Sequence, residues 1–529
     1  MLKNITKFIF ITTITGLLFC TSCNNFDDLN TNPTKSDKID PNSQLAYVQL
    51  LTWGDWQTCE PYMYYSASLV QIMQGDWNTT NYGGQYRRNN TMLGQPWMRI
   101  YGLSIKNLAD IMSNTKDKPE YVNVRSIARI FNVYCSMLLT DMYGEIPYFE
   151  AGKGESEDIS NPSYNKQDVV YKDFLKELKE VEAALIPNGD AVSGDIIYNG
   201  DITKWKRFAN SLRLRLAMRL TKVEPDLARD EAIDIMNTTS GVLTSSDNAF
   251  IKYTDLNDWT SDEIRRNSIS QLFRGRETYP TPFLCSTFWN YMKNTSDPRL
   301  LRIGRGYDET VSAGNNPFGR IDLTNEILAT AQGINQFQPS DPGYFWYEKW
   351  PSGYWSSSTQ KWQDKSCRPQ MNNVFLKGDV PGLIISYAEV QLLLSEAKAR
   401  WGALIPGTSM KLLSEYGADA ISDAEITAYL TANPFPSGIN NQLKIINEQL
   451  WVLHFNNAPE AYSNWRRSGY PVLKSSSEYG ALTKESKTIP RRFNYPLSEG
   501  SYNKEAYNAA LEAMGGRDDW NARVWWDKE

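Results

Sequence analysis

The feature that most limits what this chain can fold into is a set of long apolar stripes with helical spacing. Three segments, at about 127–139, 205–220 and 387–401, carry apolar side chains at positions i, i+3, i+4, i+7 and i+8. This spacing puts the apolar side chains on one face of an α-helix, where they can pack against other helices. The three stripes therefore predict an all-α body. In the second stripe, Arg207, Arg213 and Arg215 fall among the intervening positions.

Shorter amphipathic stretches with the same spacing cover much of the remaining chain. They lie near 43–53, 60–75, 97–112, 168–185, 226–238, 440–455 and 503–514. Several neighbouring stretches are separated only by short breaks that contain Pro, Gly or Asn, and antiparallel helix pairs need no longer connections. Helix pairs of this size indicate a solenoid-like stack of tetratricopeptide type. The 34-residue signature of that repeat is absent from the sequence.

The helical pattern gives way to an irregular region between about 241 and 382. Gly, Pro, Ser, Asn and aromatic residues dominate there, and only 283–293 keeps a helical spacing. Long irregular segments in folded chains are usually functional or disordered, and a high aromatic content favours order. We therefore expect one domain over 43–529. It consists of a helical body at about 43–240 and 383–529 and a loop-rich aromatic ligand lobe at about 241–382.

The first 22 residues read as a targeting signal. Two lysines precede an apolar run from Phe8 to Phe19, which is too short to span a bilayer. Small residues then precede Cys23, in the pattern of a bacterial lipoprotein signal peptide that is cleaved before the cysteine to be acylated. Cys20 fits less well because a bulky residue precedes it. The alternative is a plain secretory signal with ordinary cysteines, but the pattern favours residues 1–22 as a lipoprotein signal and Cys23 as the lipid-attachment residue.

The segment that follows, 23–42, is polar and predicts a flexible tether between a lipid anchor and the folded domain. Lipid chains on Cys23, and not a transmembrane helix, would hold the protein to a membrane. Asp27 and Asp28 resemble the acidic export signal of surface lipoproteins in Bacteroidetes, although an acidic tether would look the same. We therefore expect a lipid-anchored protein exposed at the cell surface.

Composition excludes several classes of function. The chain has 55 basic and 61 acidic residues, a formal net charge of -6, which argues against a nucleic-acid partner. Its single histidine, His454, excludes any metal site that needs two imidazoles. No phosphate-binding P-loop is present, and no G-x-G-x-x-G follows a predicted strand. We assign no cofactor and no metal, and the question of a structural calcium ion stays open.

Four cysteines lie beyond the signal: Cys59, Cys135, Cys285 and Cys367. Their wide spacing contains no C-x-x-C, so it indicates neither a zinc ribbon nor a redox motif. Disulfides form readily outside the cytosol, but their pairing does not follow from the sequence. Because Cys135 belongs to an apolar helical stripe, we interpret it as a small buried hydrophobic residue.

Two aromatic-rich segments suit a carbohydrate ligand. Sugar rings stack their apolar C–H faces on Trp or Tyr, while their hydroxyls need Asn, Asp, Gln or Arg as hydrogen-bond partners. Both kinds of side chain occur at 74–90, and eight aromatic residues gather at 344–362. The alternative is that these aromatics only pack the loops onto the helical body. The ligand-binding candidates are Trp77, Asn81, Tyr82, Arg87, Trp346, Tyr354 and Trp355.

The sequence gives little support to catalysis, and we assign no catalytic residue. A Ser-His-Asp triad would have to use His454, which lies at helical spacing in EQLWVLHFNNAPEAY and is interpreted as a core or groove histidine. Asp141 and Glu145 lie at a helix end, where they are expected to cap the helix or pair with arginine. A glycosidase built on two carboxylates stays open, because their separation is invisible in a sequence.

Several motifs, taken together, resemble one family. They occur in a fixed order along nearly the whole chain after the signal: the lipobox ending at Cys23, FDDLNTNPT, LLTDMYGEIPYFEA at 138–151, GDITKWKRFANSLRLRLAMRL at 200–220, SDPRL at 296–300, ISYAEVQLLLSEAKARWG at 385–402, EAYSNWRRSGYPVL at 460–473, IPRRFNYPLSE at 489–499 and RVWWD at 523–527. In this combination the chain is similar to the SusD/RagB family of nutrient-binding outer-membrane lipoproteins of Bacteroidetes.

The resemblance implies an all-helical fold with tetratricopeptide-like helix pairs on one side and an irregular ligand lobe on the other. It also implies a partner, a SusC-like TonB-dependent outer-membrane transporter over which the lipoprotein acts as a lid. Family members bind glycans, and some bind peptides, without cleaving them. The shared motifs are largely structural, so the ligand candidates above rest on composition and position alone. We expect a surface-exposed protein that binds a nutrient oligosaccharide, with a peptide-binding family member or a surface glycoside hydrolase as alternatives.

Overall fold

The computed structural model describes residues 39–74, 78–256, 263–276, 283–306, 355–356, 361–362, 369–402, 410–479 and 483–529. Three of the seven predicted ligand residues, Trp77, Trp346 and Tyr354, lie outside these ranges, as do Cys23 and Cys367. Trp355 is described only as part of a strand, without its side chain.

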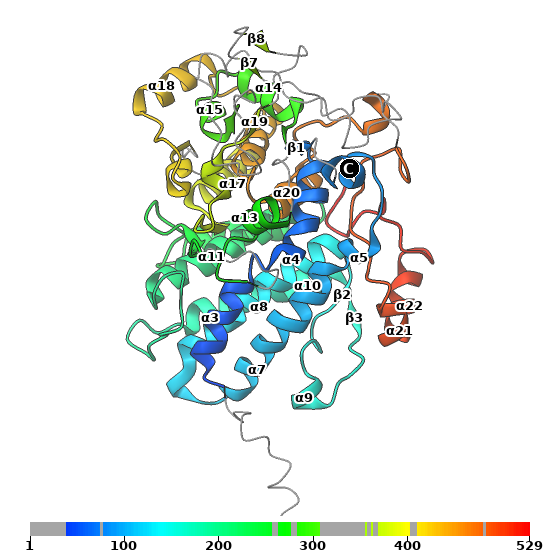
Figure 1. The fold of residues 1–529 in the computed structure, drawn as a ribbon. Coiled ribbons are helices and arrows are strands. Elements are labelled where there is room, and N and C mark those ends of the chain that lie inside the picture. Colours follow the sequence, from blue (N-terminus) through cyan, green and yellow to red (C-terminus); the bar gives the residue numbers. More distant parts are fainter. Residues whose placement is uncertain are drawn as a thin grey trace, which may run out of the picture.

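The N-terminal half of the chain forms a stack of antiparallel helices, coloured blue to green in Figure 1. Helix α8 packs against α7 and α10, α10 packs against α11, and α11 packs against α12. The helices of this layer are α3 (Pro41–Leu51), α7 (Lys106–Asn114), α8 (Val122–Tyr143), α10 (Gln167–Ala184), α11 (Ile202–Arg219) and α12 (Pro225–Met236). The apolar stripes at 127–139 and 205–220 thus form buried faces of α8 and α11, as the spacing predicts.

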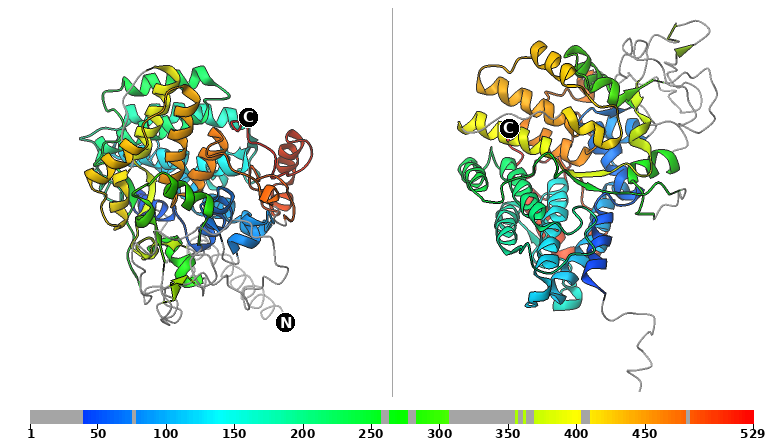
Figure 2. Two further views of the ribbon diagram at one scale, coloured as in Figure 1. Left: turned by 90° about the horizontal axis from the view of Figure 1, so that it is seen from above. Right: turned by 90° about the vertical axis from the view of Figure 1, so that its left-hand side faces the viewer.

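A second layer of helices lies beside this stack, in yellow and orange in Figures 1 and 2. Helix α17 packs against both α19 and α11, and α19 packs against α20. Ser386 begins α17 by accepting a hydrogen bond from the backbone N–H of Glu389, and Gly402 ends it in the left-handed conformation. This layer contains α17 (Tyr387–Trp401), α18 (Asp423–Ala432), α19 (Ile439–Leu453) and α20 (Ala458–Ser468). The result confirms the predicted all-α architecture.

Two of the predicted helices contain π-helical turns. The stretch near 97–112 consists of α6 (Gln95–Arg99), the π-helical turn η3 (Ile100–Ile105) and α7. The stretch near 60–75 begins with α4 (Trp56–Pro61) and continues as the π-helical turn η1 (Tyr62–Ala67). Pro61 has no backbone N–H, so the regular hydrogen-bond ladder of α4 cannot continue through it. Such turns shift the apolar register, and a plain 3.6-residue period does not reveal them.

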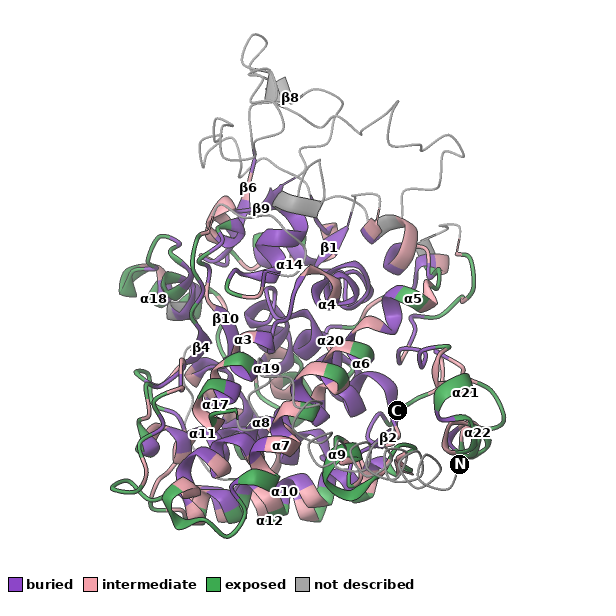
Figure 3. Ribbon diagram, turned by 60° about the horizontal axis from the view of Figure 1, so that its bottom comes forward, coloured by how far each residue is buried: buried purple, intermediate pink, exposed green. Residues whose placement is uncertain are grey.

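Short strands and helices occur where the sequence predicts an irregular lobe. A four-stranded antiparallel sheet, in the order β1-β5-β9-β6, joins β1 (Met73–Gln74), β5 (Phe283–Leu284), β9 (Gln370–Met371) and β6 (Gly304–Arg305). It lies at the end of the molecule opposite α10 and α12 (Figure 3). The helix expected near 283–293 is α14 (Ser286–Asn294). Further short elements of this region are β4 (Ala249–Ile251), α13 (Ser268–Ser270), η5 (Gln271–Arg276), α15 (Leu300–Ile303), β7 (Trp355–Ser356), β8 (Lys361–Trp362), η8 (Asn373–Leu376) and β10 (Gly382–Ile385).

The remaining short elements lie on the surface of the helical body or close to it. They are η2 (Thr79–Gly84), α5 (Asn90–Leu93), η4 (Pro119–Tyr121), β2 (Ile146–Pro147), α9 (Gly154–Glu157), β3 (Tyr164–Asn165), η9 (Met410–Tyr416), η10 (Ser476–Tyr479), α21 (Glu499–Tyr502) and α22 (Lys504–Ala513). No helix in the described ranges is both long and apolar enough to cross a membrane.

The described cysteines are core residues. Cys59, Cys135 and Cys285 are buried. Burial raises the pKa of the Cys135 thiol to about 12, so the group stays neutral. The interpretation of Cys135 as a small buried hydrophobic residue is confirmed.

Candidate ligand-binding site

Three of the predicted ligand residues come together on the loop that follows β1. Asn81 and Tyr82 belong to the π-helical turn η2, and Arg87 lies in the extended segment before α5. Arg87 Nη1 donates a hydrogen bond to Asn81 Oδ1 at 3.1 Å, and the backbone N–H of Arg87 donates to the carbonyl of Tyr82 at 2.9 Å. The Arg87 side chain is exposed and Tyr82 is partly buried. Polar and aromatic groups thus stand side by side, as a sugar ligand requires.

The ring of Tyr82 rests on a second tyrosine that sequence reasoning did not single out. Tyr65, in η1, stacks under Tyr82 with ring centroids 5.9 Å apart and an interplanar angle of 27°. The Tyr65 hydroxyl donates to the carbonyl of Arg87 at 2.8 Å and accepts from the backbone N–H of Asn89 at the same distance. Asn89 Nδ2 also donates to the Tyr82 hydroxyl at 3.3 Å. These contacts fix the plane of the Tyr82 ring.

The close approach of η2 to η1 depends on glycine. A β-carbon at Gly83 would collide with the carbonyl oxygen of Tyr64, and one at Gly84 would collide with the side-chain amide of Gln74. The sequence Tyr82-Gly83-Gly84 therefore combines an aromatic ring with two small residues that let the backbone carrying the ring approach the core closely. This glycine pair was a visible signal in the sequence, inside the 74–90 stretch.

A segment nearly 400 residues away in the sequence holds the other side of the loop. Ser476 donates its hydroxyl to the carbonyl of Gly84 at 2.7 Å and its backbone N–H to the Tyr86 hydroxyl at 2.9 Å. The N–H of Lys484 donates to the carbonyl of Gln85 at 2.8 Å. The carboxylate of Glu485 accepts hydrogen bonds from the backbone N–H and from the guanidinium of Arg88. We call residues 78–90, 474–479 and 483–488 the loop unit. Its cross-links hold the candidate residues before any ligand arrives, which lowers the entropic cost of binding.

The remaining candidates are not placed at this loop by the structure. Trp77, Trp346 and Tyr354 lie outside the described residues, and of Trp355 only the backbone is described, paired with Trp362 in the β7–β8 hairpin. Their roles stay predictions. The described residues contain no cluster of three or more His, Cys, Asp or Glu side chains that could hold a metal ion.

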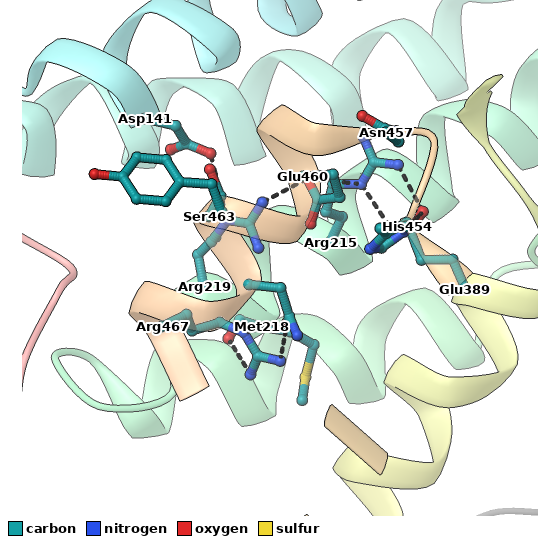
Figure 4. Close-up of polar contacts among 12 residues, drawn as sticks. Asp141, Arg215, Met218, Arg219, Glu389, His454, Asn457, Glu460, Ser463 and Arg467 are labelled. Carbon is teal, nitrogen blue, oxygen red and sulfur yellow. Dashed lines mark hydrogen bonds and ion pairs between the residues drawn. The ribbon is translucent and has the colours of Figure 1, made fainter. Parts of the chain in front are cut away.

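The single histidine belongs to a buried ion network and not to the loop unit. His454 Nε2 lies 3.2 Å from Glu389 Oε2 (Figure 4). Arg215 donates two hydrogen bonds to the same carboxylate, from Nε at 2.6 Å and from Nη2 at 2.8 Å. All three side chains are 1% exposed. Burial raises the pKa of Glu389, but Arg215 and His454 outweigh it and bring the pKa down to about 2. The result confirms the interpretation of His454 as a core residue.

The network continues towards the first helical layer. Arg219 Nη2 donates to Glu460 Oε2 at 2.6 Å, and its Nε donates to Asp141 Oδ2 at 3.4 Å. Asp141 also accepts hydrogen bonds from Tyr171 and, at 3.0 Å, from Trp526 Nε1. Burial raises the pKa of Asp141, although the nearby Arg219 works against this rise. The expected pairing of Asp141 with arginine is confirmed, and these bonds tie α8, α11, α17 and α20 together.

Comparison with known proteins agrees with this architecture. A family model described as starch-binding and associating with the outer membrane, SusD-like, matches residues 51–496. The chain belongs to the SusD-like family. Among solved structures, a SusD-like protein of Bacteroidetes AC2a is 34% identical, with a TM-score of 0.82, over 93% of this chain and 100% of the other. A chitin-binding protein is 30% identical, with a TM-score of 0.76 and the same coverage.

A third structure, a SusD homologue from Bacteroides uniformis, has a TM-score of 0.69 at 21% identity, over 93% of this chain and 100% of the other, and shows the shared fold. No curated protein matches the chain. As a SusD-like protein, the molecule is a non-catalytic member of a family described as starch-binding and associating with the outer membrane. The family resemblance and the fold predicted from the motifs are confirmed, and the glycoside hydrolase alternative is set aside.

Proposed function

We propose that this SusD-like protein binds a nutrient oligosaccharide at the cell surface and delivers it intact to a SusC-like TonB-dependent barrel transporter. Membership of a family described as starch-binding is the observation that carries the proposal. The chitin-binding relative, similar over nearly the whole chain, supports a glycan as the ligand class. The loop unit supplies the aromatic ring with polar neighbours that a sugar needs.

In this function Tyr82 provides the stacking face for a sugar ring, and Asn81 and Arg87 provide hydrogen-bond donors and acceptors for its hydroxyls. The Tyr65 ring beneath Tyr82 and the bonds from Ser476 keep the platform in place. Trp77, Trp346, Tyr354 and Trp355 complete the set of proposed ligand contacts. An open platform of this kind gives an affinity on the order of micromolar or weaker, because immobilising a flexible glycan opposes the contact energy. Weak binding suits a protein that hands its ligand on.

Replacing Tyr82 by alanine is expected to weaken oligosaccharide binding about three- to tenfold, the range that aromatic contacts give beyond their buried area. Isothermal titration calorimetry with the glycan that binds the wild-type protein measures the change. Tyr502→Ala is the matched control, because this tyrosine is 76% exposed on α21 and makes no contact with the loop unit among the described interactions. Equal affinities for wild type and Tyr82→Ala would remove Tyr82 from the site.

The membrane anchor is tested separately. Replacing Cys23 by alanine is expected to move the protein from the membrane fraction to the soluble fraction, because the thiol that would carry the lipid chains is lost. Fractionation of cells, followed by metabolic labelling with a clickable fatty acid, gives the readout. Cys20→Ala serves as the control and should remain labelled. A Cys23→Ala protein that stays labelled in the membrane would contradict the proposed anchor.

A further inference from the structure

The loop unit carries an excess of exposed positive charge on a chain that is negative overall. The net charge of the whole chain is -6. Residues 78–90, 474–479 and 483–488 contain five basic and two acidic side chains, all of them exposed. They are Arg87, Arg88, Lys474, Lys484, Lys487, Glu478 and Glu485. The unit therefore has a local formal charge of +3 next to the proposed sugar platform.

The two acids of the loop unit are already engaged within it, one by a cation and one mainly by a serine. Glu485 forms an ion pair with Arg88. Glu478 has its pKa lowered by hydrogen bonds from the N–H and hydroxyl of Ser475 and by the nearby charge of Lys474. Arg87, Lys484 and Lys487 are then left without an acidic partner among the described residues. Unpaired cations on one face attract anions and raise their local concentration.

Arg87 is the cation best placed to contact a ligand. Within the described residues its side chain makes one hydrogen bond, from Nη1 to Asn81 Oδ1 at 3.1 Å, whereas a guanidinium has five N–H donors in a planar fork. The Asn81 bond orients the fork beside Tyr82, whose backbone carbonyl accepts the Arg87 N–H at 2.9 Å. A planar fork with free donors matches the two oxygens of a carboxylate or sulfate group.

We propose that the loop unit selects an anionic oligosaccharide, one that bears carboxylate or sulfate groups, and that Arg87 is the specificity-determining residue for the charged substituent. This inference rests on the proposed function, because it assumes that the ring of Tyr82 receives a sugar. Lys484 and Lys487 add long-range attraction, and Arg87 makes the directional contact.

The test measures binding of the full chain, purified in mild detergent, to four hexasaccharides. Hexagalacturonate carries carboxylates, a sulfated chondroitin hexasaccharide adds sulfates, and maltohexaose and chitohexaose are neutral. We expect at least one anionic hexasaccharide to bind about tenfold more tightly than either neutral one at low ionic strength, with the difference shrinking as salt screens the charges. The anionic hexasaccharide that binds more tightly identifies carboxylate or sulfate as the recognised group.

Arg87→Gln is expected to weaken anionic binding about three- to tenfold more than it weakens neutral binding, since a charge-assisted contact at an exposed site is lost while the glutamine amide can still donate to a sugar hydroxyl. The control variant Lys118→Gln also removes one positive charge, from the exposed turn between α7 and α8. It should change the binding of neither the anionic nor the neutral hexasaccharides. Circular dichroism confirms that both variants keep the fold. Equal, salt-independent binding of neutral and anionic probes overturns this inference but leaves glycan binding intact. Failure to bind any hexasaccharide, with binding of polyglutamate instead, overturns the proposed function and this inference together.

Discussion

Replacing Arg215 by methionine is expected to lower the free energy of unfolding by about 3–5 kcal/mol, the range found when one partner of a buried ion pair is removed. The variant leaves Glu389 buried without its bidentate partner and with only His454 beside it. Arg215 Nη2 also donates to the carbonyl of Ile384 at 2.7 Å, so the bond between α11 and the strand before α17 is lost as well. Chemical denaturation followed by circular dichroism gives the measurement.

Two further variants show whether the loss of stability in Arg215→Met comes from the unpaired carboxylate of Glu389. The double variant Arg215→Met/Glu389→Gln is expected to recover part of the stability, because no unpaired carboxylate remains in the core. Arg229→Met removes an arginine whose ion pairs, with Asp226 and Asp230, are on the surface, and it should leave the denaturation midpoint unchanged. If Arg215→Met were as stable as Arg229→Met, the ion network would not be holding the two helical layers together.

Acid is expected to destabilise the protein strongly between about pH 5 and pH 2. Arg467 binds Glu396 through Nη1 at 2.7 Å and Nη2 at 2.8 Å. Burial raises the pKa of Glu396, but Arg467 and Arg400 outweigh it, so the pKa falls to about 2, as it does for Glu389. A carboxyl whose folded-state pKa lies below its unfolded value stabilises the protein at neutral pH, and this contribution disappears as protons bind.

Each of these two carboxyls contributes about 3 kcal/mol by this linkage, all of it present above about pH 5 and most of it lost near pH 2. Asp141 works in the opposite direction, because burial raises its pKa and protonation relieves that cost. Urea denaturation of wild type and Glu396→Gln across pH 7 to 2 gives the test. The two stabilities should differ most at neutral pH and converge in acid, where Glu396 is itself uncharged. A difference in the free energy of unfolding between wild type and Glu396→Gln that stays the same at every pH would contradict the low pKa of Glu396.

The helices were predictable because their apolar residues repeat at local spacing. The stripes at 127–139, 205–220 and 387–401 correspond to α8, α11 and α17. The same local rule does not reveal the burial of the polar positions of α11. Arg213 and Arg215 lie between the residues of its apolar stripe, yet both are 1% exposed. Arg215 can be buried because it forms an ion pair with Glu389, which lies 174 residues further along the chain. The local spacing of apolar residues does not reveal such a distant partner.

The candidate site was predictable only in part. Asn81, Tyr82 and Arg87 stand close together in the sequence, so a short loop was enough to bring them together. The support beneath and beside them was not predictable, because it comes from π-helical packing and from a segment around Ser476 that lies nearly 400 residues away. Family membership followed from the order of the motifs, which spans almost the whole chain and does not depend on any one of them.

The most direct test of the central claim is native gel electrophoresis of the full chain, in mild detergent, through gels that contain a panel of polysaccharides, with each glycan recovered and sized afterwards. We expect at least one glycan to slow the protein and to be recovered at its original length, and we expect Tyr82→Ala to migrate faster than wild type in the same gel. Unchanged mobility in every glycan, together with binding of peptides in a parallel assay, would contradict glycan binding. Recovery of shortened glycan would contradict the non-catalytic role.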